Sequence, residues 1–210
     1  MRIVAAFGSP RKGGNSDTLA EAFLHEAERL GADVERFRLN TLKFQGCIAC
    51  NECKTKTERC VLKDDLAPAL DAVREADTLL IATPVYFGDM PSQLKAFMDR
   101  CYSFYKPNYF ARKDRSRLPP GKNLVFVISQ RAPESFFVDF IQRYNFIFKA
   151  FGFNTPHLIR GCELGDNRNA AADRGDLLEK ARSTARRVLA GEPSDANIAP
   201  YRLSVDERAI

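Results

Sequence analysis

The chain has 210 residues, of which 45% are hydrophobic and 28% are charged, so it is long enough for one large, well-buried core. No apolar run approaches the ~20 residues that cross a membrane, and the N-terminal run is too short for a secretory signal. We therefore expect a cytoplasmic protein with no membrane partner. Its six cysteines then indicate ligands or reduced thiols rather than a disulfide framework.

Short apolar runs alternate with amphipathic runs of helical period along the chain. The expected strands are Ile3–Phe7, Val34–Leu39, Thr78–Ala82, Leu124–Ser129 and Pro156–Arg160. The expected helices are Ser16–Leu30, Asp64–Glu75, Pro91–Ser103, Glu134–Phe151 and Ala170–Leu189. This alternation predicts an α/β fold, a parallel sheet with helices on both faces. We expect one domain over residues 1–191, with a cysteine-rich loop at 44–63, and an irregular tail over 192–210.

The first strand is followed by a loop rich in glycine and hydroxyl groups, Gly8–Thr18. Gly13 and Gly14 let the backbone turn its amides toward an anion at the N-terminus of the next helix. The side-chain donors are Ser9, Arg11, Ser16 and Thr18. The P-loop lysine and the dinucleotide G-x-G-x-x-G pattern are both absent. The loop therefore favours a mononucleotide phosphate monoester, with an ordinary strand-to-helix turn as the alternative.

Four cysteines follow the second expected strand in the spacing C-x2-C-x2-C-x6-C: Cys47, Cys50, Cys53 and Cys60. Structural zinc is usually held by two pairs of ligands separated by a dozen or more residues. Closely spaced C-x2-C-x2-C runs are typical of iron–sulfur ligands. The spacing favours an iron–sulfur cluster, with reduced or redox-active thiols and a zinc site as the alternatives.

The third strand ends in a second candidate binding loop, Thr83–Pro91. Tyr86 and Phe87 are placed to lie against a planar ring, and the amides of Phe87, Gly88 and Asp89 to face its polar edge. In open α/β sheets, ligands bind beyond the carboxyl ends of the strands, which is where this loop falls. Aromatic core or interface residues are the alternative reading.

These loops resemble the signatures of the flavodoxin-like, NADPH-dependent FMN reductase superfamily. The matching segments are Gly8–Arg11 with Asn15-Ser16, and Thr83–Gly88 with Leu94–Arg100. The resemblance covers roughly residues 1–190 and implies a doubly wound, five-stranded parallel sheet of order 2-1-3-4-5. With the cysteines and Asp64-Asp65 added, the chain resembles the iron–sulfur flavoprotein branch, in which a compact cysteine motif holds a [4Fe-4S] cluster beside FMN.

The resemblance also implies a set of site residues. The FMN phosphate would be held by Ser9, Arg11, Asn15, Ser16 and Thr18. The isoalloxazine would be surrounded by Pro84, Val85, Tyr86, Phe87, Gly88 and Asp89. A third loop would contribute Ser129, Gln130 and Arg131, with Arg131 in place of the glycine-rich turn often found there. The cluster ligands would be Cys47, Cys50, Cys53 and Cys60.

The expected function is that of a flavin-dependent oxidoreductase with the cluster as its one-electron port. The flavin carries the reaction, so no catalytic acid, base or nucleophile is expected, and His25 and His157 are assigned structural roles. A ferredoxin-like carrier or NAD(P)H would be the donor and a small molecule such as a quinone the acceptor, in a homodimer or homotetramer. The alternative enzyme is a cluster-free NAD(P)H-dependent FMN or quinone reductase.

Part of the net charge of +5 lies in one stretch, between the third helix and the fourth strand. Its cations are Lys106, Arg112, Lys113, Arg115, Arg117 and Lys122, and aromatic side chains are mixed among them. Such a composition also suits a non-catalytic module that binds a partner or nucleic acid. The stretch lacks a recognisable nucleic-acid motif, and charge runs of this kind are usually solvated. We therefore expect a solvated or subunit-contacting loop and no nucleic-acid partner.

Overall fold

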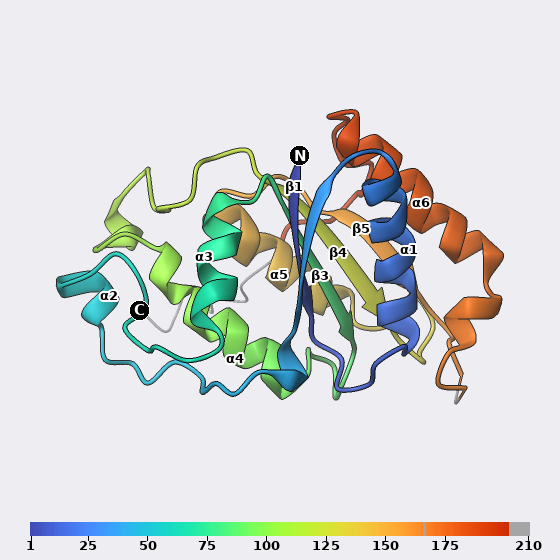
Figure 1. The fold of residues 1–210 in the computed structure, drawn as a ribbon, viewed down its shortest axis with the longest axis horizontal. Helices are drawn as coiled ribbons and strands as arrows, with labels where there is room; N and C mark the ends of the chain where they lie inside the picture. Colours follow the sequence, from blue (N-terminus) through green and yellow to red (C-terminus); the bar gives the residue numbers. More distant parts are fainter. Residues whose placement is uncertain (166, 202–210) are drawn as a thin grey trace, which may run out of the picture.

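The computed structural model describes residues 1–165 and 167–201. Five parallel strands form one sheet in the order β2-β1-β3-β4-β5 (Figure 1). The strands are β1 Arg2–Phe7, β2 Asp33–Arg38, β3 Thr78–Pro84, β4 Asn123–Ser129 and β5 His157–Gly161. The predicted flavodoxin-like strand order is confirmed.

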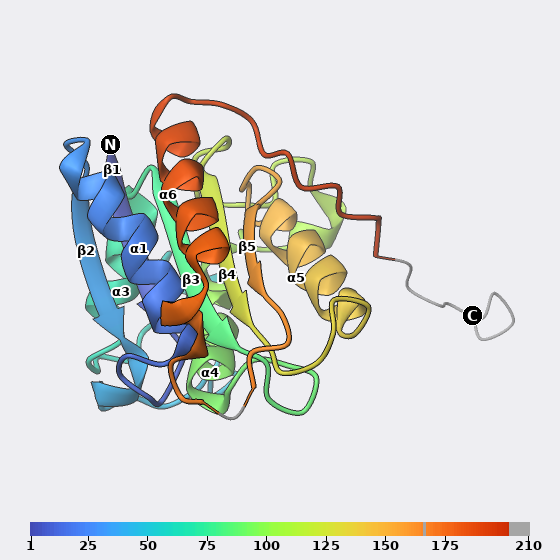
Figure 2. The ribbon, with the colours of Figure 1, turned by 90° about the vertical axis from the view of Figure 1, so that its right-hand side faces the viewer.

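Helices cover both faces of this sheet (Figure 2). The α-helices are α1 Asn15–Arg29, α2 Glu52–Thr55, α3 Ala67–Glu75, α4 Ser92–Arg100, α5 Val138–Ala150 and α6 Gly175–Leu189. Helices α1 and α6 lie side by side on one face, and α3, α4 and α5 lie on the other. Four short 3-10 turns complete the fold: η1 Leu39–Thr41, η2 Cys101–Phe104, η3 Tyr109–Ala111 and η4 Ala170–Asp173.

The sheet separates two hydrophobic cores. Alternate residues of a strand point to opposite faces, so Ile3, Ala5 and Phe7 enter the core under α1 and α6, while Val4 and Ala6 enter the other. Because both faces are covered, each central strand is apolar along its length, which is the pattern that predicted the strands. Each large side chain buried in this way contributes about 1.5–3 kcal/mol.

Several helix boundaries differ from those expected from the sequence. The α4 helix ends at Arg100, and the chain tightens into η2 instead of continuing as an α-helix to Ser103. The α5 helix begins only at Val138, because Phe137 has a left-handed backbone conformation with φ of 59°. At α6, the expected start at Ala170 corresponds to η4, and the α-helix proper begins at Gly175.

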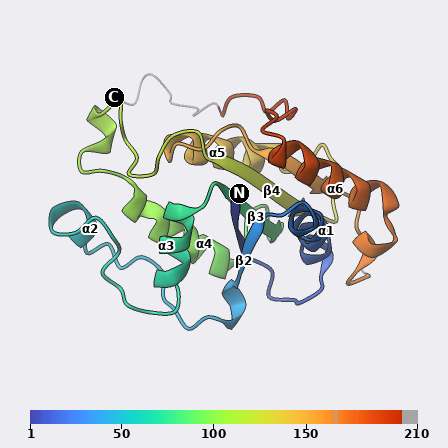
Figure 3. The same cartoon turned by 45° about the horizontal axis from the view of Figure 1, so that its top comes forward.

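The segment between β2 and α3 carries two further differences. A single helical turn, α2, forms within the cysteine loop, where the sequence suggested none. Helix α3 begins at Ala67 rather than at Asp64, and the Asp64 carboxylate instead accepts hydrogen bonds from Arg100. This loop and α2 extend from the body of the protein beside α3 and α4 (Figure 3).

The last described residues, 192–201, contain no helix or strand. Residues 202–210 of the expected tail lie outside the described part of the chain. The division into a domain over 1–191 and a tail over 192–210 stays a prediction.

Candidate functional site

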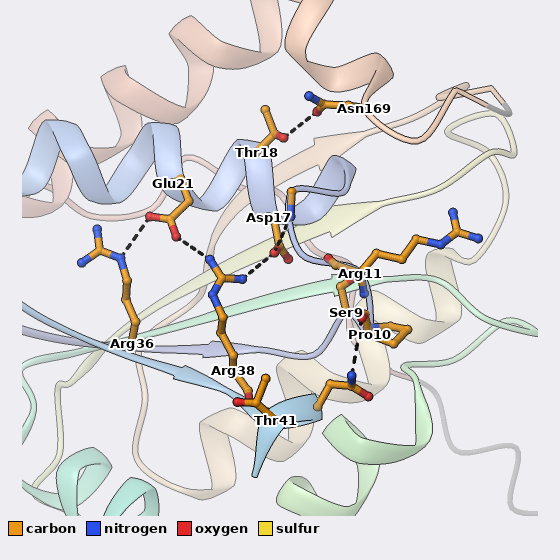
Figure 4. A network of polar contacts seen from close by, with 12 residues as sticks. Ser9, Pro10, Arg11, Asp17, Thr18, Glu21, Arg36, Arg38, Thr41 and Asn169 are labelled. Atoms are coloured by element: carbon orange, nitrogen blue, oxygen red, sulfur yellow. Dashed lines mark hydrogen bonds and ion pairs between the residues drawn. The ribbon is translucent and has the colours of Figure 1, made fainter.

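The turn between β1 and α1 is the predicted phosphate loop (Figure 4). At Gly8 a Cβ atom would lie 2.7 Å from Leu94 Cδ2, so glycine is required where the strand end meets α4. The Gln93 side chain of α4 donates from Nε2 to the Gly8 carbonyl at 2.7 Å. Gly13 has φ of +70°, a conformation that favours glycine, and it turns the chain into α1.

Ser16 stands at the start of α1 with a buried hydroxyl. The residue is 1% exposed, and its Oγ has no hydrogen-bond partner among the described residues. Leaving a buried polar group unsatisfied costs about 1–3 kcal/mol, so such a group usually marks a site for a ligand or water. The first amides of a helix also lack acceptors, and the Gly14 N-cap supplies none from a side chain. This end of α1 is therefore suited to an anion.

The other predicted phosphate ligands lie in the same loop but already have protein contacts. Thr18 donates from Oγ1 to Asn169 Oδ1 at 2.6 Å (Figure 4). The Asn15 side chain accepts from the backbone N–H of Ala171 at 2.9 Å. Ser9 Oγ accepts from the Arg11 amide at 3.1 Å, while Arg11 itself is exposed. Their contact with phosphate stays a prediction, and residues 169–171, which the sequence did not point to, close the loop from the far end of the chain.

Asp17 is a buried carboxylate that the sequence did not single out. It accepts from Arg38 at 2.6 Å and from the Gly13 amide at 3.2 Å (Figure 4). Burial raises the pKa of Asp17, and the hydrogen bond from Arg38 opposes this shift. Arg38 also pairs with Glu21 at 2.9 Å and lies 4.4 Å above the Phe7 ring. Asp17 thus fixes the loop backbone, and Arg38 offsets its charge beside the candidate anion site.

The loop after β3 is a tight two-residue turn. Tyr86 and Asp89 bond each other through their backbones at 2.7 and 3.0 Å, and Phe87 and Gly88 between them have φ of 50° and 79°. These are the features of a type I′ turn, in which a bulky residue at the first central position is strained. Phe87 is fully exposed, and neither its amide nor that of Gly88 donates to any described residue. Residues with strained backbone conformations of this kind are often found at functional sites.

Asp89 ties this turn to α5. Its Oδ1 accepts from the Tyr144 hydroxyl at 2.8 Å, and its Oδ2 accepts from Arg143 at 3.1 Å. Burial raises the pKa of Tyr144, and the hydrogen bond to Asp89 adds to the shift, so its hydroxyl stays protonated. The Asp89 side chain therefore anchors the turn. Its backbone N–H and C=O are committed to Tyr86, so of the three amides expected to face a ligand ring only those of Phe87 and Gly88 are left to do so.

The third predicted loop, at the end of β4, is mostly inward-facing. The Val85 amide donates to the Ser129 carbonyl at 2.9 Å, which joins this loop to the one after β3. Gln130 is buried: its Nε2 donates to two carbonyls of the following turn, and its Oε1 accepts two bonds from Arg160. Arg131 is exposed. The flavin contacts expected of Ser129, Gln130 and Arg131 stay predictions, and the Gln130 side chain is already committed to the protein.

The four cysteines of the loop line a single hollow together with Arg100 and Tyr102. Cys53 is buried, Cys60 is half-buried, and Cys47 and Cys50 are exposed. Ala49 and Asn51 have φ of 54° and 58°, so the chain turns sharply between the first three cysteines. Among the described residues, no three acidic, histidine or cysteine groups are gathered closely enough to hold a metal ion. The loop thus supplies four thiols to one hollow without drawing their sulfurs into a ligand set.

Arg100, at the end of α4, joins this loop to the body of the protein. Its side chain is fully buried and donates from Nε to Cys60 Sγ at 3.0 Å. The two terminal nitrogens donate to both oxygens of Asp64 and to the carbonyls of Gln45 and Leu62. All five N–H groups are satisfied, in the fork geometry that suits guanidinium–carboxylate pairs.

Lys54 is a second cationic residue that contacts a cysteine sulfur. Its Nζ lies 3.4 Å from Cys53 Sγ and donates to the carbonyls of Tyr102 and Tyr105 at 2.7 and 3.0 Å. It also lies 3.9 Å from the centre of the Tyr102 ring. Burial lowers the pKa of Lys54. The sequence assigns no role to the side chains of Lys54 and Arg100, because only the fold brings them into contact with the sulfurs.

A cleft of about 540 Å³ lies between the turn after β3 and the cysteine loop. It is lined by Asp89 of the turn after β3 and also by Cys47 and Ala49 of the cysteine loop. Tyr102 and Tyr144 contribute to its walls. The two loops, which are far apart in the sequence, therefore open onto one space.

The basic stretch forms a separate cleft at the same end of the molecule as the cysteine loop (Figure 1). Lys106 and Arg112 pair with Asp114, whereas Lys113 and Arg115 form no ion pair within the described residues. Of the two histidines assigned structural roles, His157 is buried and His25 is exposed. Of the two cysteines outside the loop, Cys101 is buried and Cys162 is half-buried.

Comparison with known proteins bears on this arrangement. The sequence profile of the family described as NADPH-dependent FMN reductase matches residues 1–114. That segment includes the turns after β1 and β3 and the whole cysteine loop. The chain belongs to the NADPH-dependent FMN reductase family. It is thus a member of a family of flavin-dependent oxidoreductases, as its loops predicted, although the loop after β4 lies beyond the match.

Individual relatives agree with this membership. The iron-sulfur flavoprotein of Archaeoglobus fulgidus is 38% identical over 100 residues, 48% of this chain and 45% of that protein. The iron-sulfur flavoprotein of Methanosarcina thermophila is 35% identical over 115 residues, 55% of this chain and 59% of that protein. The chain therefore spans about half the length of the curated relatives it matches. This similarity confirms the resemblance to iron–sulfur flavoproteins.

The fold has close structural neighbours. The NAD(P)H:quinone oxidoreductase from Methanothermobacter marburgensis superposes with a TM-score of 0.70 and 19% identity, covering 90% of this chain and 97% of that one. At this identity the likeness establishes the flavodoxin-like fold alone. Within the described residues, no helix has the length and apolar character needed to cross a membrane.

Proposed function

We propose that this protein is an FMN-dependent redox protein of the iron–sulfur flavoprotein type. It would move electrons through FMN between a small acceptor and a one-electron centre held by the cysteine loop. The observation that carries the proposal is the cleft onto which both the turn after β3 and the cysteine loop open. A two-electron and a one-electron carrier in one protein need such proximity.

The turn after β1 fits the phosphate of FMN. The buried, unpartnered Ser16 hydroxyl and the free amides of the first turn of α1 offer donors to a phosphate monoester. Ser9, Arg11, Asn15 and Thr18 would complete the site by small rearrangements of their present contacts. Arg38 would limit the repulsion between the phosphate and Asp17, since its guanidinium already pairs with that carboxylate.

The turn after β3 fits the isoalloxazine. Pro84, Val85, Tyr86, Phe87 and Gly88 would border the ring, and the outward amides of the turn would face its polar edge. FMN supplies hydride and single-electron chemistry when it is bound. The protein's part would be to hold the ring, through the anchoring of Asp89 on Tyr144 and Arg143.

The cysteine loop fits a [4Fe-4S] cluster by its donor set. Cys47, Cys50, Cys53 and Cys60 would be the ligands, since all four thiols line one hollow and thiolates are the usual ligands of such clusters. Arg100 and Lys54 contact two of these sulfurs, those of Cys60 and Cys53, through their N–H groups. A ferredoxin-like carrier is the partner proposed for this centre.

The second candidate is a cluster-free NAD(P)H-dependent FMN or quinone reductase. It is favoured by one observation: the sulfurs of the described cysteines are not gathered as a metal-binding group. In this case the cysteines would be reduced thiols, and NAD(P)H would deliver a hydride to FMN. For either function we propose a cytoplasmic homodimer or homotetramer and a small-molecule acceptor such as a quinone.

Anaerobic purification followed by analysis of FMN, iron and sulfide per chain separates the two candidates. Near one FMN and four irons per chain supports the iron–sulfur flavoprotein. One FMN with no iron, after reconstitution with iron and sulfide has also been attempted, supports the cluster-free reductase. A protein that binds no FMN would contradict both.

A further inference from the structure

The two cations beside the cysteine sulfurs differ in how their charge is balanced. Arg100 forms a two-point ion pair with Asp64, so the pair as a whole is neutral. Within residues 1–165 and 167–201, Lys54 has no carboxylate partner: besides Cys53, its ammonium group contacts two backbone carbonyls and the face of Tyr102. Arg100 therefore gives Cys60 a directed hydrogen bond without net charge. Lys54 places beside Cys53 a positive charge that no described carboxylate balances.

The surroundings of Lys54 hold that charge in place. The Tyr102 and Tyr105 carbonyls that it contacts belong to the segment directly after α4. The flat face of an aromatic ring attracts a cation, so the Tyr102 ring adds to this hold. The lysine is half-buried, and salt screens such a charge less than one on the surface.

We propose that Lys54 sets the reduction potential of the centre held by the cysteine loop, and that Arg100 is a positioning residue that holds Cys60 in place for that centre. The proposal rests on the function proposed above. Reduction adds one electron to a centre already surrounded by four thiolates, so an uncompensated positive charge stabilises the reduced form. Net charge, hydrogen bonds to sulfur and solvent exposure are the properties by which proteins set cluster potentials.

Helix α4 gives this arrangement a link to the flavin. It begins directly after the turn that follows β3, touches Gly8 through Gln93 and Leu94, and ends at Arg100. Its nine residues span about 14 Å at 1.5 Å per residue. The same rigid element thus contacts the phosphate loop at one end and Cys60 at the other, and fixes the cysteine loop relative to the flavin loops.

The test for Lys54 compares Lys54→Gln with Lys56→Gln. Lys56 lies on the same loop, is exposed and pairs with Glu52, but contacts no sulfur. The readout is the midpoint potential of the cluster in the anaerobically purified full chain, measured by an optical and EPR redox titration. We expect Lys54→Gln to reduce the ratio of reduced to oxidised cluster at fixed potential about tenfold, 59 mV for one electron, and Lys56→Gln to leave it unchanged. Lys54→Arg should restore the wild-type value.

Each other outcome decides against the proposal. A Lys54→Gln potential equal to that of wild type would overturn it while leaving the iron–sulfur function intact. Loss of iron from both Lys54→Gln and Lys54→Met would also overturn it, since Lys54 would then serve assembly. A wild-type protein that holds no iron after reconstitution would instead remove the proposed function, and this inference with it.

The test for Arg100 uses Arg100→Lys, which keeps a cation for Asp64 but cannot satisfy all five contacts. Arg74→Lys is its control, because Arg74 also donates to nearby carbonyls of Glu58 and Ser103 but to no sulfur. We expect Arg100→Lys to lower the iron content at least twofold and to shift the iron–sulfur stretching bands in resonance Raman spectra of the remaining cluster. Bands and iron content equal to those of Arg74→Lys would rule out the positioning role.

Discussion

The flavin loops and the cysteine loop are held in place by different kinds of contact. The turns after β1, β3 and β4 are joined to one another by backbone hydrogen bonds that continue the sheet, such as Gly8 N to Ala82 O and Val85 N to Ser129 O. The cysteine loop contributes no described strand to the sheet, and the side chains of Arg100, Lys54 and Arg74 are among its links to α4 and η2.

This difference predicts that FMN binding does not depend on the cysteine loop. Main-chain bonds at a sheet edge tolerate changes of side chain, whereas a loop held by cationic side chains such as those of Arg100, Lys54 and Arg74 depends on those particular residues. The flavin site should therefore survive damage to the cysteine loop. The following predictions test that separation.

The largest effect is expected for Cys53→Ala. It removes the most buried thiol of the cysteine loop, so iron per chain should fall to near zero while FMN per chain stays at the wild-type level. Cys162→Ala, outside the loop, should change neither value. Parallel loss of FMN in Cys53→Ala would show that the two sites are not independent.

Ser16→Ala is the matching change at the flavin site. Its hydroxyl is buried and has no partner among the residues that the structure describes, and a hydrogen bond to a charged group contributes about 1.5–3 kcal/mol, so FMN affinity should fall roughly 10- to 100-fold. Iron content should not change. Isothermal titration of the apoprotein with FMN measures the effect, and Ser183→Ala, which lies on α6, serves as the control. Unaltered affinity would remove Ser16 from the phosphate site.

Gly8→Ala probes the contact between the flavin loops and α4. The new methyl group would lie 2.7–2.8 Å from Leu94 carbons, and such overpacking costs about 1–3 kcal/mol. Urea unfolding should show this loss, whereas Gly175→Ala, which meets open space, should be neutral or slightly stabilising. If α4 links the two sites, cluster content should fall together with stability. A stability equal to that of wild type would mean that Leu94 and α4 shift without cost to make room for the methyl group.

The smallest effect concerns the scaffold away from both sites. Arg29 and then Arg186 hold the pKa of Glu26 at about 2, below its ordinary value of 4.5. Because the folded-state pKa is depressed, the stabilisation is present above pH 4.5 and is lost as the pH falls toward 2. Thermal unfolding of Glu26→Gln should therefore show a weaker decline than wild type within this window and a lower stability at pH 7. A wild-type pH profile in the variant would assign the acid sensitivity to other carboxylates.

Much of the fold could be predicted from the sequence because its signals are local. The strands are apolar along their length since both faces of the sheet are covered, and the glycines and hydroxyls of the turn after β1 stand together in the chain. The helix boundaries were less certain. The left-handed Phe137 before α5 and the η2 turn after α4 carry no clear local signal.

The residues that the sequence did not reveal are those whose partners lie far along the chain. Asp17 pairs with Arg38 across 21 positions and Arg100 with Asp64 across 36. In sequence, Asp17 resembles an ordinary acid in the first turn of a helix, and Arg100 an ordinary cation in the last. The Gln130 side chain, expected near the flavin, is instead committed to Arg160 and to its own turn.

The sequence by itself determined that this is a flavodoxin-like α/β protein with a phosphate loop, an aromatic turn and a four-cysteine run, because each of these is written in consecutive residues. Only the tertiary structure decided that the turn after β3 and the cysteine run open onto one cleft. It also decided that one cysteine meets a charge-balanced arginine and another an unbalanced lysine. The physical reason is that charge balance depends on which groups become neighbours, and neighbours across the chain are set by the packing of α4 on the sheet.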